Sequence, residues 1–188
     1  IIDFKDLLAG GTSYGNHRAS VDDICALQYT GGTTGPSKGV MLTQSCLTAN
    51  VAQALDVISV ASESARYSVT ALPLPLYHIY AFSLCVGVLP ALRGHSVLIP
   101  DPRNIPLFVK AIKKSKIQIF CGLNSLFVAL LENKDFRRLG FDQLKMTLSG
   151  GMPLMKSVAD QWQKVTGCIV SEGYGMTESS PIISMNPP

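Results

Sequence analysis

The sequence is short of charge, and the charge it has is not concentrated anywhere. Charged residues make up 15% of the 188 residues and apolar residues 47%, a balance that excludes a disordered chain and fits a well-buried interior. The formal net charge is only +3, and the tightest basic group is Lys113, Lys114 and Lys116. Lysines at one end of a helix complement the helix dipole, which explains this group without a ligand. Because the other basic residues are scattered, we expect no nucleic-acid partner.

Paired cysteines, a secretory leader and a membrane-spanning run are also lacking. The five cysteines are odd in number and form no C-x-x-C pair, which argues against a disulfide framework or a zinc site and for a reducing, cytoplasmic compartment. The most lipid-like stretch, residues 79–92, has 14 residues and contains Pro90, whereas a spanning helix needs about 20. We expect a buried helix there and no transmembrane segment; peripheral contact with the inner face of a membrane stays open. Because the chain begins at Ile1 rather than Met, we interpret it as part of a longer protein.

Short apolar runs rich in β-forming residues alternate with helical patterns along most of the chain. This alternation predicts an α/β fold in which a largely parallel sheet is flanked by helices. The expected strands are Ala26–Tyr29, Val40–Leu42, Val69–Leu72, Ser96–Ile99, Ile117–Cys121, Met146–Leu148 and Cys168–Val170. The expected helices are Phe4–Leu8 and the apolar faces that begin after Thr43, at Pro106, after Asn124 and at Pro153, the last ending at Gly167.

The most informative segment is the glycine- and threonine-rich run from Tyr29 to Gly39, between two expected strands. Its glycines let backbone N–H groups converge on an anion, its threonines add hydroxyl donors, and Lys38 adds a positive charge suited to a polyphosphate. The common P-loop spacing fails because Ser37 precedes Lys38 and Gly39 follows it, and no G-x-G-x-x-G dinucleotide motif occurs. The residues expected to hold phosphate are Thr30, Gly31, Gly32, Thr33, Thr34, Gly35, Lys38 and Gly39.

A second polar segment, Glu172-Gly-Tyr-Gly-Met-Thr-Glu178, follows an expected strand, at the sheet edge where open α/β folds place ligands. Tyr174 offers an aromatic face for adenine, Thr177 a hydroxyl for the α-phosphate, and Glu178 an oxygen ligand for phosphate-bound Mg²⁺. In Ser149-Gly-Gly-Met-Pro-Leu154, two glycines at a strand end permit the close approach of a flat ring. These segments together predict a nucleotide site.

These motifs, in this order, resemble those of the adenylate-forming superfamily, which contains acyl-CoA synthetases, luciferases and the adenylation domains of peptide synthetases. The run Tyr29–Gly39 is similar to the family signature [YF]-T-[SG]-G-T-T-G-x-P-K-G, with Ser37 where most relatives have proline, a change that should loosen the loop slightly. Three more segments resemble the family's P-L-[FY]-H segment, the turn that walls the acyl pocket and the turn that flanks adenine: Pro75–Tyr80, Gly122–Phe127 and Ser149–Leu154. In detail the resemblance is greatest to bacterial long-chain fatty-acid–CoA ligases.

The resemblance implies part of the large N-terminal domain of an ATP-dependent acid–thiol ligase, with the upstream part and the C-terminal lid absent from residues 1–188 and the isolated chain inactive. It implies that a fatty acid, ATP and Mg²⁺ bind here, with Tyr77 and residues 79–89 lining the acyl pocket, and that CoA binds mostly outside this chain. The implied catalytic residues are Lys38, His78, Thr177 and Glu178, with His78 orienting the acid and Glu178 as the metal ligand. The implied nucleotide-binding residues are the phosphate-loop residues above with Gly150, Gly151, Met152, Pro153, Glu172, Gly173, Tyr174, Gly175 and Thr177.

Three alternatives stay open. A ligase of the same superfamily that activates an aryl or medium-chain acid fits the same motifs. Gly11-Thr-Ser-Tyr-Gly15 matches the G-x-S-x-G nucleophile elbow of esterases, but the elbow requires a strand before Ser13, whereas Phe4–Leu8 is expected to be helical. A module that senses ATP without turning it over is disfavoured, because both Lys38 and Glu178 are present.

Overall fold

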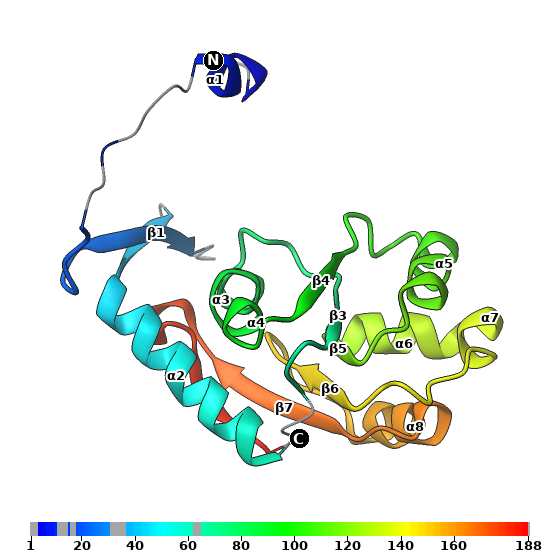
Figure 1. Ribbon diagram of the computed structural model, residues 1–188. Helices are drawn as coiled ribbons and strands as arrows, with labels where there is room; N and C mark the ends of the chain where they lie inside the picture. The colour runs from blue at the N-terminus through cyan, green and yellow to red at the C-terminus, as the bar shows by residue number, and fades with distance from the viewer. Residues whose placement is uncertain (1–3, 11–14, 16–17, 31–36, 62–64, 188) are drawn as a thin grey trace.

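A six-stranded sheet organises the chain, with a separate two-stranded hairpin beside it (Figure 1). The computed structural model describes residues 4–10, 15, 18–30, 37–61 and 65–187. The sheet has the order β4-β3-β5-β6-β7-β8, in which the first five strands are parallel and β8 is antiparallel to β7. The expected α/β fold with a largely parallel sheet is therefore confirmed.

The strands lie within a few residues of the apolar runs that predicted them, with two differences. They are β1 Ile24–Thr30, β2 Lys38–Thr43, β3 Val69–Leu72, β4 His95–Leu98, β5 Ile119–Gly122, β6 Met146–Ser149, β7 Val170–Gly175 and β8 Ile182–Met185. The last expected strand, Cys168–Val170, is displaced, because β7 begins at Val170 and continues to Gly175. Strand β8 was not expected; it pairs with residues 173–175 and so extends β7 through residues expected to follow it.

Capping groups account for where several helices begin and end. The helices are α1 Phe4–Gly10, α2 Gln44–Ala61, α3 Ile79–Ser83, η2 Leu84–Val88, α4 Leu89–Ala91, α5 Ile105–Ser115, α6 Asn124–Glu132, α7 Lys134–Arg137, α8 Lys156–Thr166 and the short η3 Thr177–Ser179. The Thr43 hydroxyl accepts the Cys46 N–H at 3.3 Å, and Asn104 Oδ1 accepts the Leu107 N–H at 3.3 Å. Gly167, with a φ of 76°, ends α8 as expected.

Two expected helix starts are wrong, for a shared reason. Asn124 is the first residue of α6 rather than its cap, and its Oδ1 instead accepts the Met155 N–H at 3.0 Å. Helix α8 begins at Lys156 rather than at Pro153, and Met155, just before it, is 58% exposed. The hydrogen bond from α6 holds Met155 in an extended conformation, so the helix starts only after it.

Helices cover both faces of the sheet, which makes three layers (Figure 1). Strand β5 shows the alternation, since Phe120 packs with α5, α6 and α8 on one face while Ile119 and Cys121 pack with α2, α3 and η2 on the other. Helix α1 stands apart from these layers (Figure 1). Among the described helices, none combines the length and apolar character needed to cross a membrane.

Trp162 of α8 is the centre of the larger core. Its ring centroid lies 5.0 Å from that of Phe120, 4.7 Å from Phe127 and 5.4 Å from Phe136, and its side chain is fully buried. Its indole Nε1–H donates to the Thr147 hydroxyl of β6 at 3.0 Å. One side chain thus joins α6, α7 and α8 to the sheet and satisfies a buried hydroxyl.

We expect Trp162→Ala to lower the free energy of unfolding by about 3–5 kcal/mol, because it leaves a cavity among the three phenylalanine rings that surround it. Trp162→Phe should cost about 1–3 kcal/mol, because it keeps a ring but removes the donor to Thr147. Denaturant titration followed by circular dichroism measures both. Lys164→Ala, an exposed change on the same helix, is the control; an alanine variant at position 162 no less stable than this control would contradict the role of the ring.

Candidate functional site

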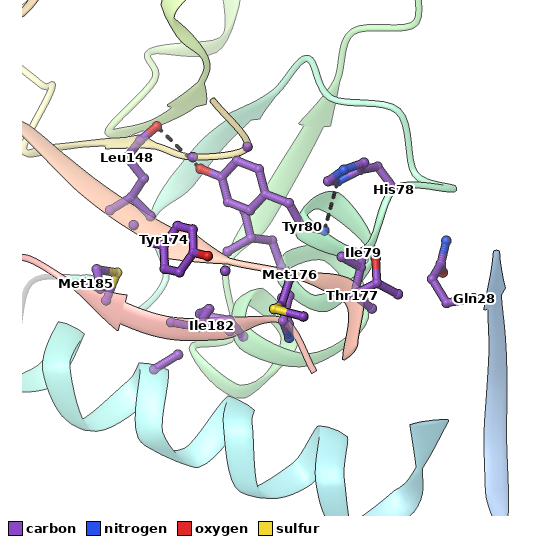
Figure 2. A pocket seen from close by; sticks show the side chains of 18 of the residues that line it. Gln28, His78, Ile79, Tyr80, Leu148, Tyr174, Met176, Thr177, Ile182 and Met185 are labelled. Atoms are coloured by element: carbon purple, nitrogen blue, oxygen red, sulfur yellow. Dashed lines mark hydrogen bonds between the residues drawn. The ribbon is translucent and has the colours of Figure 1, made fainter. Parts of the chain in front are cut away.

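A cavity of about 470 Å³ opens beside the carboxyl ends of β6 and β7 (Figure 2). Ligands bind at this edge in open α/β sheets, and the volume is in the range of small-molecule sites. The lining comes from the end of β1, the middle of α2, residues 77–88, residues 148–151 and residues 171–185. The predicted site residues on this lining are Thr30, His78, Gly150, Gly151, Gly173, Tyr174, Gly175, Thr177 and Glu178.

One wall of the cavity is the turn after β6, faced by Tyr174 of β7. Gly151 has a φ of 79°, a conformation that favours glycine. Its chain neighbours aside, no described residue lies within 4 Å of where its Cβ would stand. Tyr174 is 64% exposed, so its ring has a free face on the cavity side (Figure 2). A planar base can therefore approach the backbone of the turn and the tyrosine ring together.

Glu172 supports the segment after β6 through a hydrogen bond to its backbone. Its Oε2 accepts the Leu154 N–H at 2.9 Å, and β7 places it in register with Ser149 of β6. Neither Glu172 nor the predicted Met152 and Pro153 lines the cavity. Contact of these three residues with a nucleotide stays a prediction, while the structure gives Glu172 a supporting contact.

The turn between β7 and β8 carries Thr177 and Glu178. It is closed by hydrogen bonds from the Met176 N–H to the Pro181 carbonyl at 2.9 Å and from the Ser179 N–H to the Met176 carbonyl at 3.0 Å. Thr177 is half-buried and Glu178 exposed, and both line the cavity. Since the turn projects both side chains from the end of a strand, a hydroxyl and a carboxylate face the same opening.

The oxygen ligands that line the cavity suit Mg²⁺ only when phosphate groups supply further ligands. Glu178 supplies the one carboxylate among the described residues that line the cavity. Within the described part of the chain, no group of three or more His, Cys, Asp or Glu side chains is arranged to hold a metal. Mg²⁺ is commonly held by one or two carboxylates with substrate phosphates and water, so a single glutamate here matches that chemistry.

His78 caps helix α3 at the mouth of the cavity. Its Nδ1 accepts the Tyr80 N–H at 3.2 Å, so the neutral ring carries its proton on Nε2 (Figure 2). Gln28 of β1, which sequence reasoning missed, donates from its side chain to the Tyr77 carbonyl next to it. The hairpin and the His78 segment are thereby joined, and His78 presents a donor rather than a base.

The far end of the cavity is apolar and is built by residues from several elements. Tyr77 and residues 79–89 were expected to line an acyl pocket. Five of them line this cavity, and their contact with an acyl chain stays a prediction: Tyr77, Ile79, Tyr80, Leu84 and Val88. Sequence reasoning missed the residues that face them from α2 and β8, which are Ala54, Ile58, Ile182 and Met185. The apolar face expected for α2 could have indicated two of these residues, since Ala54 and Ile58 lie on that helix and line the cavity.

The half-buried Tyr80 and the fully buried Cys121 form a neutral pair at this apolar end. The Tyr80 hydroxyl donates to the Leu148 carbonyl at 3.4 Å (Figure 2). Burial, and to a lesser degree the neighbouring Cys121, raises the pKa of the Tyr80 phenol well above its ordinary value. Burial raises the pKa of the Cys121 thiol to about 12. Neither group ionises near neutral pH, so the floor of the cavity carries no charge.

Part of the predicted phosphate loop is placed and part is not. Thr30 ends β1 on the cavity, and Lys38 begins β2 opposite Thr30, followed by Gly39 opposite Tyr29. Lys38 and Gly39 do not line the cavity, although β2 contacts η3. The remaining loop residues, Gly31, Gly32, Thr33, Thr34 and Gly35, lie outside the described residues.

The esterase alternative finds no support in the part of the chain that is described. Ser13 lies outside the described residues, but the segment before it is helix α1, whereas a nucleophile elbow follows a strand.

Sheet and cavity together define an open-sheet α/β protein with a ligand site at the carboxyl ends of its strands. The model of the AMP-binding enzyme family matches residues 5–188, and the chain belongs to that family.

Relatives of known function are similar over nearly the whole chain. A long-chain-fatty-acid–CoA ligase of Haemophilus influenzae is 40% identical over 189 residues, which cover 99% of this chain and 34% of that protein. A 4-coumarate–CoA ligase 3 of Oryza sativa subsp. japonica is 31% identical over 98% of this chain and 33% of that protein. ATP-bound MatB from Rhodopseudomonas palustris has a TM-score of 0.81 at 26% identity, covering 97% of this chain and 35% of that one. The chain thus spans about a third of the length of the relatives it matches.

The buried Cys121 thiol should make the free energy of unfolding fall as the pH becomes alkaline. A folded-state pKa of about 12 against an ordinary 9.0 means that the unfolded chain loses this proton first. Stability from this group is complete below pH 9.0 and falls as the pH rises towards 12, by about 1.4 kcal/mol per pH unit. Between pH 8 and pH 10, denaturant titration should show wild type losing about 1.4 kcal/mol more than Cys121→Val. Replacement of the exposed Cys46 by valine is the control, and an equal loss in wild type and Cys121→Val would contradict the assignment.

Proposed function

We propose that this chain is the nucleotide- and acyl-binding core of a long-chain fatty-acid–CoA ligase, which uses ATP to convert a fatty acid to acyl-AMP and passes the acyl group to CoA. One observation carries the proposal: a single cavity joins a polar end, with Thr30, Thr177 and Glu178, to an apolar end built by α2, η2 and β8. A fatty acid has the same division, a charged head and an apolar tail. Similarity to long-chain fatty-acid–CoA ligases at 40% identity supports this choice of substrate.

The chemistry explains why both ends must meet. A carboxylate is a poor acyl donor because oxide is a poor leaving group, and joining it to the α-phosphate of ATP with loss of pyrophosphate makes AMP the leaving group. This displacement is accelerated mainly by positioning and by neutralisation of charge. In our proposal Thr177 donates to the α-phosphate and Glu178 holds Mg²⁺, which neutralises charge on the phosphates.

His78 is proposed to orient the acid rather than to move a proton. Its Nδ1 is already occupied by the Tyr80 N–H, so only the Nε2–H is free to face the cavity. A donor at this point, between the polar and apolar ends, suits a carboxylate head group. Lys38, at the start of β2, and the phosphate loop are proposed to hold the β- and γ-phosphates, and CoA is proposed as the acyl acceptor.

Glu178→Gln in the full-length protein should keep the fold and lower kcat on the order of 100-fold, because one strong electrostatic stabiliser of the transition state is lost. Pyrophosphate release with ATP and palmitate, measured across a Mg²⁺ titration, tests this. Glu132→Gln is the matched control, because it makes the same change at an exposed glutamate at the end of α6 that does not line the cavity. Wild-type turnover of Glu178→Gln at every Mg²⁺ concentration would remove this residue from the mechanism.

Palmitate should give a higher kcat/KM than octanoate, and octanoate a higher value than acetate, since each buried methylene contributes about 0.8 kcal/mol. Pyrophosphate release by the full-length protein with these acids and with 4-coumarate measures the order. If acetate ranks first, the fatty-acid assignment is wrong and only the family assignment stands. If 4-coumarate ranks first, the aryl-acid alternative replaces it.

A further inference from the structure

An asparagine in the middle of α2 makes a paired contact with a strand far away in the sequence. Asn50 is only 6% exposed, and both ends of its amide bind the backbone of one residue, Ile182 at the start of β8. Nδ2 donates to the Ile182 carbonyl at 2.8 Å, and Oδ1 accepts the Ile182 N–H at 3.0 Å. Strand β8 is the edge of the sheet, so the amide takes the place that a peptide of a neighbouring strand would occupy.

The contact lies between the two halves of the cavity. Ile182 directly follows the turn that carries Thr177 and Glu178, and its own side chain lines the cavity (Figure 2). On α2, Ala54 and Ile58 lie one and two helical turns after Asn50 and form part of the apolar wall. The amide therefore ties the polar turn to the helix that shapes the apolar end.

The turn itself needs such a tether. Ser180, immediately before Pro181, has a φ of 73° without being glycine, and such left-handed conformations persist only where the surroundings hold them. On the β7 side the turn is closed by the bond from the Met176 N–H to the Pro181 carbonyl. On the other side, Asn50 supplies both a donor and an acceptor to the residue that ends the turn.

We propose that Asn50 is a positioning residue, which sets the place of the Thr177–Glu178 turn relative to α2 and so aligns the phosphate-binding end of the cavity with its apolar wall. The proposal rests on the function proposed above. It requires an amide, because a carboxylate can accept the Ile182 N–H but cannot donate to the carbonyl, and an alanine does neither.

The test uses two variants of the full-length protein. Asn50→Asp keeps the shape of the side chain but loses the donor. Asn50→Ala introduces no buried charge, so it can be measured even where the carboxylate of Asn50→Asp hinders folding. Gln53→Ala is the matched control. Gln53 Oε1 accepts a further hydrogen bond from Asn50 Nδ2, at 3.3 Å, and its removal leaves both bonds to Ile182. We measure kcat per folded enzyme with palmitate, the Mg²⁺ concentration that gives half the maximal rate, and hydrogen exchange at the Ile182 amide.

Both Asn50 variants should lower kcat on the order of 100-fold, as expected when a catalytic group is misplaced by about 1 Å. Both should also raise the Mg²⁺ requirement. Asn50→Ala should speed exchange at Ile182, because it removes the acceptor of that N–H, whereas Asn50→Asp keeps it. Gln53→Ala should stay within about twofold of wild type in all three measurements. A merely structural role would reduce the amount of folded protein but leave kcat per folded enzyme and the Mg²⁺ requirement unchanged, and that result would overturn the proposal.

Failure of the proposed function gives a different pattern. If wild type releases no pyrophosphate with any acid, the ligase assignment fails, and the affinity for ATP with Mg²⁺, measured by calorimetry, takes the place of kcat. Weaker binding in both Asn50 variants, with faster Ile182 exchange in Asn50→Ala, would still support the positioning role. Unchanged binding in both variants, or unchanged exchange in Asn50→Ala, would overturn it.

Discussion

The close approach of the Pro181 carbonyl to Gly175 is the contact on which the rest of the site depends. A Cβ at position 175 would stand 2.2 Å from that oxygen, so no residue with a side chain fits without moving the backbone. Because the chain can pass this closely, it leaves β7, makes one tight turn and returns as β8 along the same edge. The turn then sets Thr177 and Glu178 at the mouth of the cavity, and the returning strand supplies Ile182 and Met185 to its apolar end.

The two ends of the cavity are consequently not independent structures. Among the strands that the structure describes, β8 pairs only with β7, and on its other side α2 supports it through Asn50. The apolar wall that α2 contributes and the carboxylate that the turn contributes share this one junction. A movement of α2 that widened the apolar end would therefore also move Glu178, so the width of the apolar end and the position of the carboxylate are coupled.

Local patterns predicted most of the fold, and the motifs predicted most of the polar lining. The strands β3, β5 and β6 and the helices begun by Thr43 and near Pro106 follow from apolar runs and capping residues, which act over a few positions. Strand β8 could not be predicted, because the short run Ile182–Met185 becomes a strand only where β7 is there to pair with it. The start of α8 was wrong for a related reason, since the hydrogen bond from Asn124 to the Met155 N–H joins residues 31 positions apart.

The segment from Glu172 to Glu178 mixes two kinds of residue that the sequence presents alike. Glu172 and Gly175 make the geometry possible, the first by binding the Leu154 N–H and the second by leaving room for Pro181. Tyr174, Thr177 and Glu178 line the cavity and carry the side chains suited to bind a ligand there. A sequence motif contains both supporting and ligand-facing residues, because the site needs both at fixed spacing. Only the contacts in the structure distinguish one kind from the other. Gly175 and Glu172 resemble nucleotide ligands in the sequence, but their contacts show that they support the geometry of the turns. Binding and catalysis then depend on the few side chains that line the cavity.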